Sequence, residues 1–234
     1  MAESLVLALQ LIAQADAQLL GIAALSLRVS LTACLLGAVL GMGLGAWLAV
    51  ARFPGHQALV WAVNTLLAMP SVVVGLLVYL LLSRSGPLGS WGILFTPSAM
   101  VVAQTILVIP LIAALSRRVV ADALAGGGDQ LIALGARPLV AAVLMLVHER
   151  LAAMTVLLTA FGRAIAEVGA VMIVGGNIAG VTRVMTTTIA LETSKGDLPL
   201  AVALGLVLIG VVGLIHSGVA LLPVRDKAMR EAMA

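Results

Sequence analysis

Five long apolar runs, separated by short polar connections, constrain the fold of this chain more than any other feature. They occupy residues 22–50, 58–82, 98–116, 151–175 and 199–222. Each run is long enough to cross a hydrocarbon layer of about 30 Å as a helix. Hydrophobic residues make up 62% of the sequence, whereas a soluble domain is about 45–50% apolar. The sequence therefore predicts an all-α integral membrane protein with about five transmembrane helices.

Two features modify these spans. Pro70 lies in the second run and Pro110 in the third, and we expect each proline to kink its helix. Residues 3–18 read ESLVLALQLIAQADAQ, which predicts an amphipathic helix at the membrane interface rather than a signal peptide. The expected organisation is an interfacial helix at 1–20, a transmembrane domain at 21–224 and a tail at 225–234.

The basic residues of the connections predict the orientation of the chain. One set of connections carries eight of them, namely Arg52, Arg117, Arg118, Arg137, Arg150, Arg225, Lys227 and Arg230. The opposite set carries three, namely Arg84, Arg183 and Lys195. This excess places the first set in the cytoplasm, the amino terminus outside and the carboxyl terminus inside. The net charge is only +3 and the basic residues lie at span ends, so a nucleic-acid partner is excluded.

The segment at 119–150 is the most polar interruption and contains ADALAGGGDQLIALGARPLVAAVLMLVHER. Its three consecutive glycines predict a joint between helices, and Asp129 is expected to cap the second of them. Gly135 ends that helix, and Pro138 begins another. The short helix would have an apolar side formed by Leu131, Ile132 and Leu134. Such a helix fits a groove on a partner protein, and it fits a position on the bilayer surface equally well.

Arg163 and Glu167 form a second constellation, inside the fourth run. Residues four apart share a helix face and can pair, and charges within a membrane face the protein interior. One interpretation is an ion pair that fixes helix packing. The other is a charged group lining a translocation path, with Arg163 attracting an anion.

The same run ends in Gly175-Gly176-Asn177, which predicts unwinding of the helix near the outer surface. A short outer helix is expected around the threonine run, which comprises Thr186, Thr187 and Thr188. The hydroxyls and the Asn177 amide suit hydrogen bonding to an oxyanion. They suit capping of broken helix ends as well, which is their more common use.

Glycines at positions 37, 41 and 45 recur at four-residue spacing in the first span. Gly37, Gly41 and Gly45 thus share one face and allow close approach of another helix, either as general packing or as a dimer seam. The sequence contains no G-x-x-x-x-G-K-[ST] loop, no credible catalytic or metal-binding arrangement, and one cysteine, Cys34. The chain is therefore not expected to be an enzyme or to hold a cofactor.

The 119–150 segment resembles the cytoplasmic loop of ABC-importer permeases. Asp129 takes the family's acidic position and Gly135 its glycine, flanked by Leu134 and Ala136. The sequence departs from that pattern where Gln130 and Leu131 replace two alanines and His148 replaces a proline. The resemblance implies that residues 122–137 form a coupling helix that docks into a separate ATPase.

Three further runs resemble the molybdate and tungstate branch of these permeases, and the tungstate type most closely. They are LSLRVSLTA, FGRAIAEVGAVMIVGGNI and TRVMTTTIALETSKGD. The resemblance implies a type I importer permease in the cell membrane, working as a homodimer. It also implies two ATPase copies that bind ATP and Mg²⁺, and an extracytoplasmic binding protein that delivers the oxyanion.

Two other classes of function stay open at this point. An ion-gradient-driven secondary transporter would use Glu167 or His216 as its proton-coupling group. A membrane anchor or assembly subunit would not transport at all. Within the ABC class, molybdate or another small anion is the alternative to tungstate.

Overall fold

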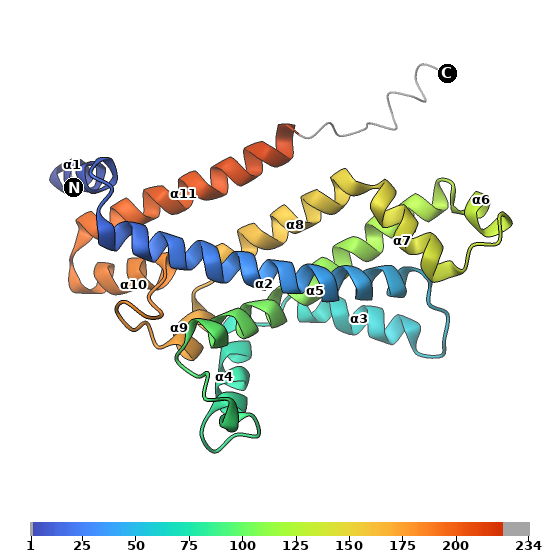
Figure 1. Ribbon diagram of the computed structural model, residues 1–234, viewed down its shortest axis with the longest axis horizontal. Helices are drawn as coiled ribbons and strands as arrows, with labels where there is room; N and C mark the ends of the chain where they lie inside the picture. Colours follow the sequence, from blue (N-terminus) through green and yellow to red (C-terminus); the bar gives the residue numbers. More distant parts are fainter. Residues whose placement is uncertain (1, 222–234) are drawn as a thin grey trace.

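The computed structural model describes residues 2–221, except the side chains at 2, 3, 129, 132, 216 and 219–221. The expected tail at 225–234 lies outside the described residues, as does the His216 side chain. The elements in chain order are α1 (Ala2–Ala13), α2 (Ala17–Val50), α3 (His56–Leu66), α4 (Ser71–Leu82), the 3-10 helix η1 (Gly89–Trp91), α5 (Pro97–Ala125), α6 (Gly128–Ala133), α7 (Pro138–His148), α8 (Arg150–Ile165), α9 (Gly169–Gly175), α10 (Met185–Lys195) and α11 (Leu198–Leu221). Figure 1 shows their arrangement.

Three helices, α2, α5 and α11, are each long and apolar enough to cross a membrane. At 1.5 Å per residue, the 34 residues of α2 span about 51 Å and the 29 residues of α5 about 44 Å. Both exceed the hydrocarbon thickness of about 30 Å, so their ends reach the interfaces. Two bent pairs, α3 with α4 and α7 with α8, bring the candidate spans to five. The prediction of an all-helical membrane protein is confirmed.

The first predicted span and the interfacial helix differ from expectation at their junction. The amino-terminal helix α1 ends at Ala13, not near residue 18, and α2 begins at Ala17 rather than at 22. Asp16 separates the two because its carboxylate caps α2, accepting a hydrogen bond from the Leu19 amide at 2.9 Å.

The second predicted span is not one kinked helix. The chain turns between α3 and α4, which meet at a 100° bend. Pro70 stands at the N-cap of α4, where its missing N–H removes nothing from the helix. Pro110, by contrast, lies within α5, which continues unbroken past it.

The fourth span was predicted at 151–175, and that boundary is wrong. Helix α8 ends at Ile165, α9 is a separate element, and the long candidate span is α7 with α8, bent by 80°. The prediction assigned α7 to the polar loop because charged residues flank it. In the fold its buried Ala142 packs against Ala46 of α2 and Val120 of α5.

Helices α2 and α5 run parallel and touch along the glycine stripe. A Cβ atom at Gly37 would lie 2.5 Å from Val108 Cγ2, and one at Gly41 would lie 2.8 Å from Ile112 Cβ. At Gly45 it would lie 2.6 Å from the Ala113 carbonyl oxygen. The three glycines therefore allow the two backbones to approach more closely than any side chain would permit.

The helix directions alternate along the chain. The start of α2 packs with the end of α8 and the start of α11, through Leu19, Ile165 and Leu204. Consequently α2, α5 and α11 share one direction and α8 runs opposite. Figure 1 places α1 and α10 at one end of the molecule and α6 at the other. Arg52, in the connection between α2 and α3, thus lies at the α6 end. Arg118, which was predicted in a connection, lies at the same end but within the last turns of α5.

Candidate functional site

The break between α8 and α9, at residues 166–168, is the most unusual feature of the bundle. Inside a membrane the free backbone groups of a broken helix need partners from the protein. Gln104 of α5 donates from Nε2 to the Ala164 carbonyl at 2.9 Å. Glu167 Oε1 accepts from the Ala170 amide at 3.2 Å, and Thr186 of α10 donates to the Glu167 carbonyl at 2.7 Å. Three different elements hold the break.

The predicted pair forms across this break. Arg163 Nη1 lies 2.7 Å from Glu167 Oε2. The Glu167 side chain is only 3% exposed, whereas that of Arg163 is 48% exposed. A guanidinium has five N–H donors, and among the described residues Glu167 is its single ion-pair partner. The two charges of the pair nearly cancel. The exposed guanidinium of Arg163 nevertheless keeps N–H donors that Glu167 does not use.

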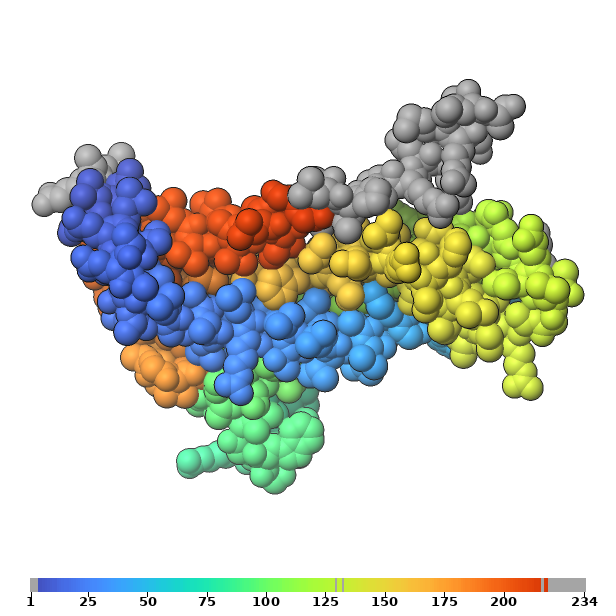
Figure 2. Space-filling view, turned by 45° about the horizontal axis from the view of Figure 1, so that its top comes forward, coloured from blue at the N-terminus to red at the C-terminus, as the bar shows by residue number. Residues whose placement is uncertain are grey.

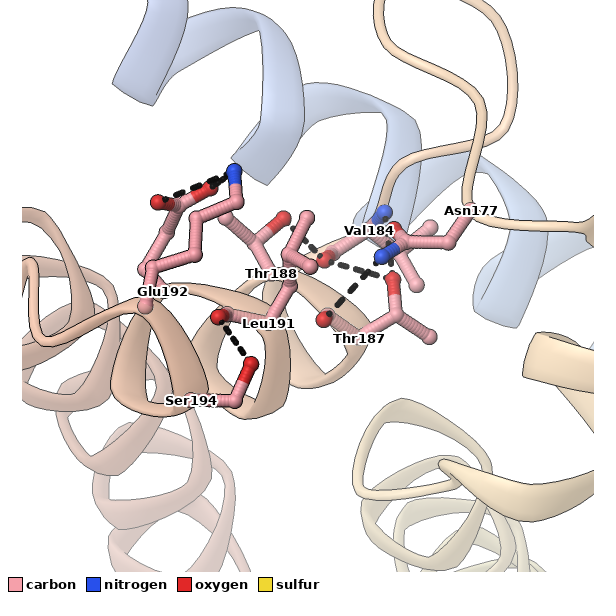
Figure 3. Close-up of polar contacts among 8 residues, drawn as sticks. Asn177, Val184, Thr187, Thr188, Leu191, Glu192 and Ser194 are labelled. Atoms are coloured by element: carbon pink, nitrogen blue, oxygen red, sulfur yellow. Dashed lines mark hydrogen bonds and ion pairs between the residues drawn. The ribbon is translucent and has the colours of Figure 1, made fainter.

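The outer segment unwinds where the sequence predicts. Helix α9 ends at Gly175, and Gly176 and Asn177 adopt left-handed backbone angles, with φ of +69° and +50°. The Asn177 side chain donates from Nδ2 to the Thr187 carbonyl at 3.4 Å (Figure 3). Its Oδ1 is buried with no hydrogen-bond partner among the described residues.

The predicted short helix is present as α10, and its threonines are buried. Thr187 and Thr188 both donate to the Val184 carbonyl, at 3.1 and 2.7 Å (Figure 3). Thr187 also accepts from the Val184 amide at 3.2 Å, so it caps the first turn of α10. Each hydroxyl proton is already used inside the protein, because Thr187 and Thr188 bond the first turn of α10 and Thr186 bonds the Glu167 carbonyl.

The structure thus separates the predicted residues into two neighbouring groups. Arg163, Glu167 and Thr186 meet at the break between α8 and α9. Asn177 lies with Thr187 at the start of α10. Sequence reasoning missed Gln104, which is buried at the break. Its signal was available, because an amide in the middle of an apolar span requires an internal partner.

The other candidate segment lies at the far end of the molecule. Helix α5 ends at Ala125, and α6 begins at Gly128, so Asp129 lies inside α6 and does not precede it as a cap. The predicted end is present: Gly135 has φ of +83°, and the Ala136 amide bonds back to the Leu131 carbonyl at 3.0 Å. This closes α6 in the manner of a Schellman motif.

The surface around α6 presents an apolar side chain to the outside. Leu134 is 84% exposed, while Leu131 and Ala136 are half-buried. The Ile132 side chain lies outside the described residues. The segment containing α6 stands at one extremity of the molecule (Figure 2). It makes few contacts with the bundle, and Leu134 is not covered by any of the residues that the structure describes.

A polytopic helical bundle with a broken, charge-bearing span is typical of membrane transport proteins. The chain is 41% identical over 199 residues to a probable anion ABC transporter permease protein of Haloferax volcanii, covering 83% of this chain and 86% of that protein. It is 41% identical over 210 residues to the tungstate uptake system permease protein TupB of Peptoclostridium acidaminophilum, covering 89% and 91%. The TupB protein of Campylobacter jejuni is 42% identical over 147 residues, covering 63% and 62%.

No protein-family model matches the sequence. The relatives nevertheless show the family, and the chain belongs to the permease subunits of ABC transporters for tungstate and related anions. It is a multi-pass membrane protein and not itself an enzyme. Permeases of this class work with ATPase and binding-protein partners.

Proposed function

We propose that this permease carries an oxyanion, tungstate in the first place, from an extracytoplasmic binding protein into the cytoplasm. It does so as a homodimer, and the ATP and Mg²⁺ that drive the cycle bind to two copies of a separate ATPase. Support for tungstate comes from the 41% identity to a protein named as a tungstate uptake permease. Molybdate and other small anions are the alternatives within the same class.

The exposure of Arg163 carries the proposal for the path. An arginine at the bilayer centre costs about 2.5–3.5 kcal/mol on insertion scales, yet the Arg163 side chain is 48% exposed in one protomer. A second copy facing it would enclose a hydrated path and remove that side chain from lipid. Glu167 offsets most of the positive charge, so an anion is attracted only weakly and can leave again.

The segment from Asn177 to Thr188 would form the outer wall of this path. The Asn177 amide and the Thr187 and Thr188 hydroxyls donate inside the protein, so we assign the segment the role of a gate held in shape by Thr187 and Thr188. The Thr186 hydroxyl links this gate to the break that carries Arg163. Movement of the gate and of the charged pair would then be coupled.

Coupling to the ATPase is assigned to residues 122–137 in the cytoplasm, with the amino terminus outside. Support comes from the exposed Leu134, which directly follows the short helix α6 at one end of the bundle, a shape that fits a groove. Closure of the ATPase pair would push α6, and the rigid ends of α5 and α7 would pass the motion to the spans.

Arg163→Gln tests the path in proteoliposomes that contain the permease, its ATPase and the binding protein. Uptake of tungstate should fall at least tenfold while the complex still co-purifies, because the glutamine removes the charge and keeps most of the volume. Arg84→Gln, in the outer connection, is the matched control. Collapse of the complex in Arg163→Gln would make the pair a packing device instead.

The same vesicles separate ATP-driven transport from gradient-driven transport. Uptake should require ATP inside and the ATPase, and a pH step without ATPase should give none. Uptake on a pH step alone would overturn the proposal and point to Glu167 or His216 as a proton carrier.

Leu134→Asp tests the docking surface. Because this side chain is 84% exposed, the bundle should fold normally while the ATPase no longer co-purifies. Trp91→Asp is the matched control, since Trp91 is 59% exposed in η1, away from α6. Stoichiometric ATPase binding by Leu134→Asp would exclude α6 as the docking element.

A further inference from the structure

A pocket lies at the α6 end of the molecule, away from the break between α8 and α9. It has a volume of about 810 Å³ and is formed where the last turns of α5 meet the corner between α7 and α8. One wall is apolar and comprises Leu115, Val119, Val147, Leu151 and Val156. The proposed path uses none of these residues.

The pocket also gathers charges of both signs. Arg118 and Asp122 come from α5, and Glu149 and Arg150 from the α7–α8 corner. His148 lies beside them. No ion pair joins any of these four charged groups to another residue in the part of the chain that the structure describes. Elsewhere in the described residues, Arg163 pairs with Glu167 and Lys195 pairs with Glu192. The charged groups of the pocket, by contrast, do not pair with one another.

The height of the charges matches a lipid headgroup. Arg118 is 21 residues beyond the first residue of α5, which places it about 32 Å along the helix. The hydrocarbon layer is about 30 Å thick. With the start of α5 at one interface, Arg118 therefore reaches the opposite one. The apolar wall extends back from this level toward the acyl chains.

We propose that this pocket binds one zwitterionic aminophospholipid, of the phosphatidylethanolamine type. Its phosphate would lie between Arg118 and Arg150, and its ammonium would donate to Asp122 and Glu149. One acyl chain would lie along the apolar wall. Charge complementarity carries the choice of occupant, since guanidinium groups bind phosphate and carboxylates accept from a primary ammonium.

Three other occupants fit less well. A free oxyanion or an anionic lipid such as phosphatidylglycerol carries no ammonium, so it would leave Asp122 and Glu149 without a donor from the ligand. A choline headgroup has no N–H to donate, so it would leave the carboxylates without hydrogen bonds. The pocket should therefore discriminate among headgroups of equal chain length.

Native mass spectrometry of the full-length permease, purified with its ATPase, tests whether the pocket prefers phosphatidylethanolamine. The complex is incubated with phosphatidylethanolamine, phosphatidylcholine or phosphatidylglycerol bearing identical chains. Phosphatidylethanolamine should be retained about tenfold better than the other two, equivalent to 1.4 kcal/mol. Equal retention of all three, or preference for phosphatidylglycerol, would overturn the assignment. Displacement of the bound lipid by millimolar tungstate would also overturn it, and would make the pocket an oxyanion site.

Paired variants test which residues bind the ammonium of the headgroup and which bind its phosphate. The pair Asp122→Asn with Glu149→Gln should bring phosphatidylethanolamine down to the phosphatidylcholine level. The pair Arg118→Gln with Arg150→Gln should lower retention of all three lipids. Arg52→Gln, at the same end but outside the pocket, should change nothing, and an equal loss in that control would contradict a specific site. If a paired variant fails to fold, the order in which the unaltered protein retains the three lipids still tests the proposal.

Discussion

The Thr186 hydroxyl lies 2.7 Å from the backbone carbonyl oxygen of Glu167 and donates a hydrogen bond to it, across 19 residues of sequence. This contact joins α10 to the break between α8 and α9. The same glutamate caps α9 through the Ala170 amide and pairs with Arg163. One residue thus connects the outer segment, the broken helix and the charged pair.

Thr186→Val should destabilise the protein by about 1 kcal/mol, because a buried carbonyl loses its donor while the side-chain volume is unchanged. Thr186→Ser keeps the hydroxyl and should restore most of that stability. Thermal unfolding of the detergent-purified protein measures both. Thr193→Val, at an exposed position of α10, is the control. Equal midpoints for Thr186→Val and the unaltered protein would show that this hydrogen bond does not hold the break.

Glu167→Gln alone should lower transport and stability less than Arg163→Gln. The glutamine still occupies the buried site, whereas loss of the arginine leaves a buried carboxylate unpaired. Breaking a buried pair costs about 3–5 kcal/mol, and the 48% exposure of Arg163 reduces this figure. The double variant should regain stability but not uptake. A double-mutant cycle on unfolding and uptake measures this, and recovered uptake would count against a role for Arg163 in the path.

Gly45→Val should destabilise the bundle by about 1–3 kcal/mol through overpacking. A Cβ at this position lies 2.6 Å from a backbone oxygen of α5, which cannot move aside as a side chain does. Gly43→Val is the matched control, since nothing lies within 4 Å of its Cβ position. Unfolding midpoints compare them, and similar values for the two variants would contradict close packing at Gly45.

Gly135→Ala should weaken ATPase co-purification while leaving bundle unfolding unchanged. Gly135 has φ of +83°, a conformation that costs an alanine about 1–2 kcal/mol, so the end of α6 would shift. Gly127→Ala has open space and no positive φ and serves as the control. The amount of ATPase that each variant pulls down measures the effect. Unchanged binding by Gly135→Ala would show that the end of α6 tolerates a shift.

Much of the fold could be predicted from local pattern. The apolar runs gave the candidate spans, and Gly135 with Pro138 marked the end of α6 and the start of α7. The break at 166–168 could not be found that way, since the run is apolar on both sides of it. It depends on Gln104 and Thr186, which come from distant segments. For the same reason, sequence pattern did not reveal that α7 is an apolar helix packed against α2 and α5, where its Ala142 is buried.

The near contact of two backbones along Gly37, Gly41 and Gly45 has a mechanical consequence. Two helices packed this closely cannot slide past each other without collision. Helices α2 and α5 should therefore move as one rigid unit. Shape change during a cycle would then occur at the bends and breaks of the other elements, among them those at 67–70, at Glu149 and at 166–168. A covalent bridge between α2 and α5 should leave turnover intact, whereas one that spans the break at 166–168 should arrest it.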